Sequence, residues 1–274
     1  MKMPYTSFAL LYCAGLILAG FASVADAAVI SNLGTLGGSY SRGFGINASG
    51  EVTGGSNAAG STSNRGFLYT GGTMYDLGTL GGPITFAFAI NASGEVAGSS
   101  LYSPTSGAQH AFLYTGIPGA GGMMHDLGTL GGSSSGGYAI NSFGQVVGAS
   151  DTTGNAAAHA FFYTGTPGVD GVMIDLDAWL DANYPAEGAN WTLEDASGLT
   201  DTGLITGSGQ YNDGPGGLTD GLRAYILDAS ILVPERTMVP EPTTLSLLAL
   251  SGLILLCRRR VRLRMLLKRA QYWP

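Results

Sequence analysis

Charged side chains and cysteines are scarce in this chain of 274 residues. Asp, Glu, Lys and Arg make up 11% of it, against a usual share of about 25%, and two cysteines offer no disulfide framework. Glycine is abundant, at 45 residues, but it does not recur at every third position, which excludes a collagen helix. A hydrophobic content of 45% argues against an intrinsically disordered chain. This composition, rich in Gly, Ser, Thr, Val and aromatic residues, is typical of an all-β protein with many turns.

The first 27 residues have the pattern of a secretory signal peptide. Lys2 supplies the positive charge, residues 8–24 form an apolar run that contains Cys13, and Ala25-Asp26-Ala27 places small residues at a cleavage site. We therefore expect export and removal of residues 1–27 by signal peptidase.

The other end combines an apolar segment with a basic tail. Residues 245–257 are apolar and seven Lys and Arg follow. Thirteen helical residues span about 20 Å, short of the hydrocarbon core of about 30 Å. Residues 242–244 and the arginine stems complete a membrane span, with the basic tail in the cytoplasm. The alternative is a buried core helix followed by a nucleic-acid patch, which fits poorly behind a signal peptide.

This segment resembles a known sorting signal. Val239-Pro240-Glu241-Pro242, the apolar run and then Arg258, Arg259 and Arg260 together resemble the PEP-CTERM signal of Gram-negative bacteria. The resemblance implies processing by an exosortase, a transient anchor in the inner membrane through the C-terminal helix, and delivery to the cell envelope or the exopolysaccharide matrix. One departure is that residues 261–274 continue beyond the arginines, whereas family members usually end there.

The part of the chain between these two signals is strongly acidic. Residues 28–242 hold 18 Asp and Glu against four Arg, a net charge of −14. Such a surface repels nucleic acid. Cys13 and Cys257 both lie in the segments expected to be removed, so the mature fold is expected to have no disulfide.

Internal repetition is the strongest feature of the sequence. The sequence of residues 32–38 recurs at 76–82 and 126–132, and only its first two positions recur in the fourth unit, at 175–176. The mean period is about 48 residues. Each unit is expected to hold four short strands. Residues 86–90 and 95–98 are joined by the turn 91–94, and 67–70 and 73–77 by Gly71-Gly72.

Four strands in each period predict a four-bladed, β-propeller-like domain. The fourth blade ends at 224–227 with no outer strand, and residues 29–33 are homologous to that strand. We therefore expect the N-terminal strand to close the ring; the alternative is an open β-solenoid capped by the fourth unit. The expected segments are repeats at 29–70, 74–115, 123–164 and 172–228 within a body of 28–230, a linker at 231–238, the sorting signal at 239–260 and a basic tail at 261–274.

The repeat resembles the HAF family of extracellular repeats, which is named for a His-Ala-Phe strand. His110-Ala111-Phe112 and His159-Ala160-Phe161 match it, whereas Arg65-Gly66-Phe67 and Arg223-Ala224-Tyr225 depart from it. The family has no assigned reaction, so the resemblance implies no catalytic residue and no cofactor.

Four residues at one repeat position form the candidate binding site: Arg65, His110, His159 and Arg223. Arginine does not ligate metals, so we expect no metal there. Donors arranged around an axis would bind sulfate, uronic acids or sugar hydroxyls. In the alternative interpretation, each donor satisfies a neighbouring carbonyl at the start of its strand.

The fourth unit has the densest acidic residues and three large aromatic residues. Its carboxylates, Asp175 and Glu194 among them, offer the alternative of a secreted glycan hydrolase. The stretch 177–181 is expected to start a short helix, and Trp179, Tyr184 and Trp191 either stack on a sugar or seal the core. The sequence favours an exported, non-enzymatic surface or matrix protein that is structural or interacts with exopolysaccharide.

Overall fold

The computed structural model describes residues 30–212, 214, 217 and 220–233. The expected signal peptide, the sorting signal and the basic tail lie outside these residues, as does most of the expected linker.

Four antiparallel sheets make up the described fold. The first has the order β1 (Gly37–Ile46), β2 (Val52–Ala58), β3 (Asn64–Thr70), β4 (Thr73–Asp76). The second has the order β5 (Thr85–Ile90), β6 (Val96–Leu101), β7 (Gln109–Thr115), β8 (Met123–Asp126). The third consists of β9 (Gly131–Ile140), β10 (Val146–Thr152), β11 (Ala158–Thr164) and β12 (Val172–Asp175). The fourth has three strands, β13 (Trp191–Leu199), β14 (Leu204–Tyr211) and β15 (Gly221–Asp228). The all-β prediction with four units of short strands is thereby confirmed.

The hairpins predicted from turn residues are also confirmed. β5 pairs with β6 around the turn 91–94, and β3 pairs with β4 around Gly71-Gly72. Gly94 closes the first of these turns at a φ of 79°, and Gly50 and Gly144 do the same in the neighbouring units. A positive φ is readily adopted by glycine alone, so the local sequence dictates these turns.

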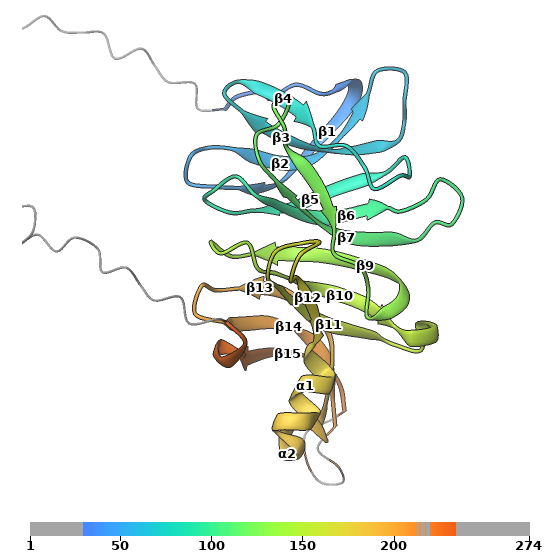
Figure 1. Ribbon diagram of the computed structural model, residues 1–274, viewed down its shortest axis with the longest axis vertical. Helices are drawn as coiled ribbons and strands as arrows, with labels where there is room; N and C mark the ends of the chain where they lie inside the picture. Colours follow the sequence, from blue (N-terminus) through green and yellow to red (C-terminus); the bar gives the residue numbers. More distant parts are fainter. Residues whose placement is uncertain (1–29, 213, 215–216, 218–219, 234–274) are drawn as a thin grey trace, which may run out of the picture.

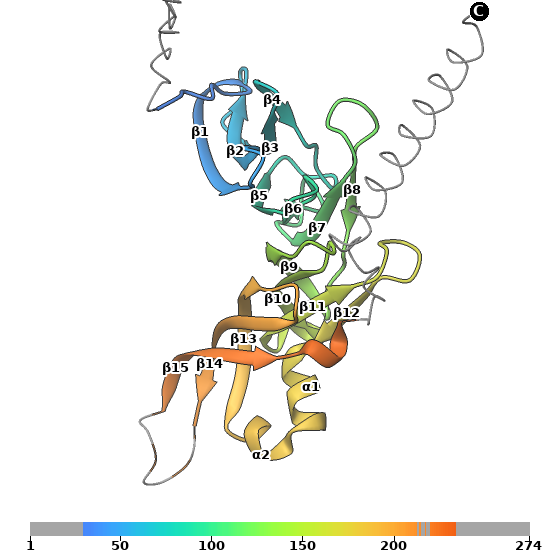
Figure 2. The same cartoon turned by 90° about the vertical axis from the view of Figure 1, so that its left-hand side faces the viewer.

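The sheets are stacked one on another in chain order, as Figures 1 and 2 show from two directions. The first strand of each sheet packs across the sheet before it: β5 contacts β1, β2 and β3, and β9 contacts β5, β6 and β7. Three separate hydrophobic clusters fill the three spaces between sheets. Their fully buried large side chains include Leu68, Phe112, Phe161, Phe162, Leu193 and Ile205.

The closed ring predicted from residues 29–33 is not formed in this structure. The first and fourth sheets lie at opposite ends of the stack (Figure 1), and residues 30–36 form no strand. Ser41 Oγ donates to the carbonyl of Gly34, and Leu36 N donates to Ser56 Oγ, so this segment is held on the first sheet. Within the described residues the domain is therefore an open stack, and Val29 lies outside them.

An amide ladder joins the turns of successive units. Asn47 Nδ2 donates to the carbonyl of Asn91, Asn91 Nδ2 to that of Asn141, and Asn141 Nδ2 to that of Thr200. The fourth unit has threonine at this position, which lacks an amide donor, so the ladder ends there.

The fourth unit differs from the others in ways that suit the end of a stack. Side chains in β14 and β15 alternate between buried and exposed, so one face of this sheet meets solvent. Helices α1 (Leu176–Asn183) and α2 (Pro185–Gly188) precede it. The short helix predicted around 177–181 is confirmed, and Asp175 caps it by accepting bonds from two backbone N–H groups.

Candidate functional site

Three of the four predicted binding residues form the same contact in three sheets. Arg65 Nη2 lies 3.1 Å from Asp76, His110 Nδ1 2.9 Å from Asp126, and His159 Nδ1 2.9 Å from Asp175. In each pair the donor lies on the third strand of its sheet and the aspartate ends the fourth. The partner is thus a side-chain carboxylate of the next strand, a contact that neither interpretation of the sequence included.

Arg223 occupies the same position in the fourth sheet, which has three strands within the described residues. Its Nη1 donates to the carbonyl of Leu222 at 2.9 Å. The four residues therefore lie one to a sheet along the stack, and no contact between them is found among the described residues. Their role in binding stays a prediction.

The acidic residues of the fourth unit have structural partners. Asp177 Oδ1 accepts the backbone N–H of Leu193 at 2.7 Å, Asp195 binds the hydroxyl of Ser208, and Glu194 accepts from Gln210 at 3.1 Å. Burial raises the pKa of Asp177, and the Leu193 N–H and the nearby His159 partly offset this rise. These contacts join α1 to β13 and β13 to β14.

The two tryptophans of the fourth unit line its core. Trp179 lies 5.6 Å from Tyr184 and Trp191 lies 4.8 Å from Tyr211, measured between ring centroids. Both tryptophans are partly buried and pack against the hydrophobic cluster between the third and fourth sheets. This placement agrees with the core-sealing interpretation for the two tryptophans, whereas Tyr184 is 47% exposed.

A run of aromatic rings on the first strands was not predicted. Phe88 of β5 lies 5.5 Å from Phe44 of β1, 5.9 Å from Phe86 and 5.9 Å from Tyr138 of β9. Phe44 and Tyr138 are 37% and 39% exposed, so the run is open to solvent at both ends. It crosses three sheets as one surface.

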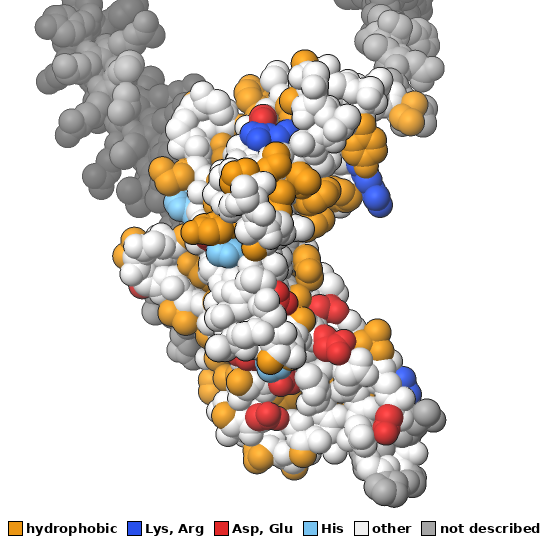
Figure 3. Space-filling view, turned by 90° about the vertical axis from the view of Figure 1, so that its right-hand side faces the viewer, with side chains coloured by type: hydrophobic (Ala, Val, Ile, Leu, Met, Phe, Trp, Pro, Cys, Tyr) orange, Lys and Arg blue, Asp and Glu red, His pale blue; other side chains and the backbone are white. Residues whose placement is uncertain are grey.

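These rings lie in an open groove of about 570 Å³. Arg42 lies over the Phe44 ring at one end, 5.1 Å from its centroid. Hydroxyl and amide groups border the rings, and Asp151 also lines the groove. In the face shown in Figure 3, hydrophobic side chains gather over the first two sheets and most acidic ones over the last two. The polar residues that line the groove are Arg42, Ser99, Gln109, Ser134, Ser135, Tyr138, Ser150 and Asp151.

The Tyr138 hydroxyl keeps its proton at neutral pH. Burial raises the pKa of this phenol above its usual value, and the negative charges of Asp195 and Asp151 raise it further. Tyr138 therefore presents both a ring face and a hydroxyl that donates and accepts hydrogen bonds in the groove.

In the described part of the chain, His, Cys, Asp and Glu side chains nowhere gather in groups of three that would hold a metal ion. Among the helices in the described ranges, none has the length and apolar character to cross a membrane.

Fold and groove together define an all-β repeat protein with an aromatic surface along its stack. Comparisons with protein-family models, with curated proteins and with solved structures found no match. The resemblances to HAF repeats and to the PEP-CTERM signal accordingly stay predictions from the sequence.

Proposed function

We propose that this protein is an exported component of the cell surface or extracellular matrix and that its aromatic groove binds a polysaccharide chain. The observation that carries the proposal is the solvent-exposed run of Phe44, Phe88 and Tyr138 across three sheets. The apolar face of a pyranose ring packs on aromatic side chains, while hydroxyl and amide groups at the border bond its hydroxyls. A groove that continues from sheet to sheet suits a polymer.

Charge favours a neutral glycan over a uronic-acid polymer. The expected mature segment carries a net charge of −14, which repels polyanions. Three of the donors predicted to bind acidic sugars each face an aspartate: Arg65, His110 and His159. The charged residues that line the groove are one arginine, Arg42, and one aspartate, Asp151.

Replacing Tyr138 by alanine is expected to weaken binding to a soluble neutral β-glucan about tenfold, because one stacking surface is lost. A tenfold change corresponds to about 1.4 kcal/mol. Tyr138→Phe keeps the ring and is expected to retain most of the affinity. The measurement is affinity electrophoresis in gels with and without the glucan.

Tyr184→Ala removes an exposed tyrosine outside the groove and serves as the matched control. Wild-type mobility that is unchanged by the glucan, or equal losses in Tyr138→Ala and Tyr184→Ala, would overturn groove binding. Stronger retention by alginate than by the glucan would overturn the preference for neutral chains.

Export and sorting are supported by residues 1–27 and 239–260, which lie outside the described structure. The intact mass of protein purified from the native host is expected to begin near Ala28 and to end near Pro242, in the envelope or medium fraction. A mass that continues to Pro274 in the membrane fraction would contradict exosortase processing and indicate a permanent anchor.

The hydrolase alternative depends on the carboxylates of the fourth unit. Two of these have structural contacts, since Asp175 caps α1 and Glu194 accepts a hydrogen bond from Gln210. No observation in the described residues favours a catalytic pair there.

A further inference from the structure

The outer edge of β15 is unpaired within the described part of the chain. In the first three sheets the equivalent strands β3, β7 and β11 each pair with a fourth strand. β15 pairs with β14 on one side. Its other side presents backbone N–H and C=O groups with no strand partner among the described residues, and such an edge is a template for strand addition.

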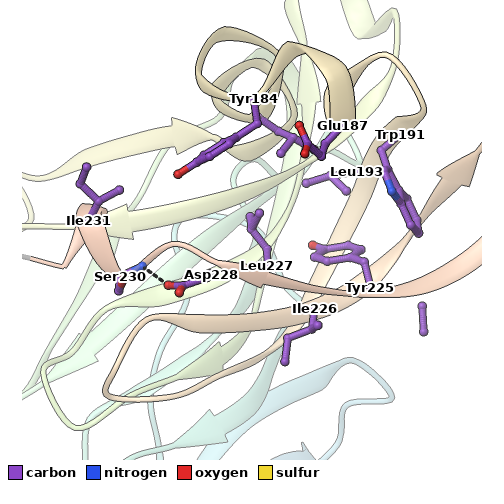
Figure 4. Close-up of a pocket in the computed structure, with 12 residues that line it drawn as sticks. Tyr184, Glu187, Trp191, Leu193, Tyr225, Ile226, Leu227, Asp228, Ser230 and Ile231 are labelled. Atoms are coloured by element: carbon purple, nitrogen blue, oxygen red, sulfur yellow. Dashed lines mark hydrogen bonds between the residues drawn. The ribbon is translucent and has the colours of Figure 1, made fainter.

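A pocket of about 590 Å³ surrounds this edge (Figure 4). Successive residues of a strand point to opposite faces, and the consecutive residues 224–228 all line the pocket. The pocket therefore wraps around the edge of the strand. Tyr184 of the helical segment, Trp191 of β13 and Ile231 complete its apolar wall, and Ile226 is 76% exposed.

The chain contains a segment that matches the missing strand. In each of the first three sheets the fourth strand ends in Asp and precedes Leu, at Asp76-Leu77, Asp126-Leu127 and Asp175-Leu176. Asn32-Leu33 begins the same string at the N-terminus, after Ile30 and Ser31. The register of β3 with β4 pairs Phe67 with Asp76 and Leu68 with Tyr75. Transferred to the fourth sheet, it pairs Tyr225 with Asn32, Ile226 with Ser31 and Leu227 with Ile30.

The segment of the same molecule does not reach this edge. Gly34 and Leu36 are hydrogen-bonded to the first sheet, at the far end of the stack (Figure 1). Stacked sheets lie about 10 Å apart, so the first and fourth are separated by about 30 Å. Residues 30–33 extend over about 14 Å at most. A strand that completes the fourth sheet must therefore come from another copy.

The N-terminal end of the stack also has no neighbouring sheet among the described residues. Ile46, which ends β1, is 69% exposed, whereas the equivalent Ile90 and Ile140 pack against the clusters between sheets. Ile30 is 89% exposed, so no described residue covers its apolar side chain. Within the described residues, one end of the stack thus has a segment that forms no strand, and the other end has a sheet whose outer edge is unpaired.

We propose that residues 30–33 of one molecule pair antiparallel with β15 of a second copy, in a head-to-tail assembly. Each molecule has one donor segment and one acceptor edge, so the contact is heterologous and propagates into linear chains. This inference deepens the proposed matrix role and rests on the removal of residues 1–27, which frees the donor segment. It is independent of glycan binding.

The test uses mature protein purified from the host, with its N-terminus verified by mass. Sedimentation velocity of the wild type is expected to show dimers and longer chains that increase with concentration. Ile30→Asp is expected to remove the donor and Ile226→Asp the acceptor, so each variant alone stays monomeric. An equimolar mixture of the two is expected to form dimers and nothing longer, because one donor and one acceptor remain functional.

Val169→Asp, at a position 82% exposed on a loop, is the matched control and is expected to assemble like the wild type. All three substitutions fall on exposed side chains, so the monomers are expected to keep the wild-type circular dichroism spectrum. A wild type that stays monomeric at every concentration, or a mixture that forms no dimer, would overturn the proposal. An N-terminus found at Met1 would instead contradict export, which separates the two failures.

Discussion

Replacing Asn91 by alanine is expected to lower the free energy of unfolding by about 3–5 kcal/mol, because the change leaves buried polar groups without partners. Asn91 is 5% exposed and its side chain makes four hydrogen bonds. Its Oδ1 accepts the N–H groups of Ser93 and Glu95, both at 3.0 Å. Its Nδ2 donates to Glu95 Oε2 at 2.6 Å and to the carbonyl of Asn141 at 3.0 Å. One side chain thus shapes its own turn and joins it to the next sheet.

Asn47→Ala is the matched control for this prediction. Asn47 makes the equivalent four bonds, to Ser49 N, Glu51 N, Glu51 Oε2 and the carbonyl of Asn91. It lies in the turn between β1 and β2 and is only partly buried, so water can replace some of the hydrogen bonds that the substitution removes. We expect a loss of about 1–2 kcal/mol. Urea unfolding followed by circular dichroism measures both, and equal losses would contradict the role of burial.

The elements of each unit could be predicted because their signals are local. An Asn at the start of a turn and a Gly that closes it fix the hairpin between β5 and β6. Asp177 in the first turn of the stretch 177–181 indicates the start of α1 in the same way. The repeat also predicts only three strands for the fourth unit up to residue 228, and the described residues of that sheet form three.

The predicted closure is not seen in the described residues, because homology indicates what kind of strand a segment resembles but not whether it reaches its partner. Residues 29–33 resemble β4, β8 and β12 in sequence, and this likeness predicts pairing without indicating the distance to the fourth sheet. The direction of stacking depends on how β5 lies across the first sheet. That contact is made through small residues: a Cβ added at Gly66 would lie 2.9 Å from Thr85 Cγ2. No short-range sequence pattern indicates the angle at which one sheet packs on the next.

The aromatic groove and the repeated ion pairs were missed for a related reason. Phe44, Phe88 and Tyr138 are far apart in sequence, yet each stands two residues before the isoleucine that ends its strand. Aligning the units with one another would have placed the three rings in one column. Asp76 and Asp126 form a second such column opposite Arg65 and His110. An alignment of the four units therefore indicates sites that the linear sequence alone does not.

One glycine in the second strand of every unit faces the backbone of the first strand. A Cβ at Gly54, Gly98, Gly148 or Gly207 would collide with the carbonyl oxygen of Arg42, Phe86, Gly136 or Asp195 respectively. In the second sheet the pairing register shifts beside this point, between Ala87 and Ala89. Such a bulge bends the first strand. The glycine lets the bent strand approach closely while it packs across the preceding sheet.

Gly98→Ala is consequently expected to be among the most damaging single substitutions, with a loss of about 4 kcal/mol or more in unfolding free energy. The new methyl group meets the Phe86 carbonyl and lies 2.7 Å from Cε1 of the buried Phe112. Neither the paired strand nor the packed ring has room to move. Gly43→Ala is the control, since its Cβ meets only Val52 Cγ1, at 3.3 Å. Urea unfolding is expected to separate the two variants widely. Similar midpoints would mean that the first strand bends without the close approach, and that the open stack has another cause.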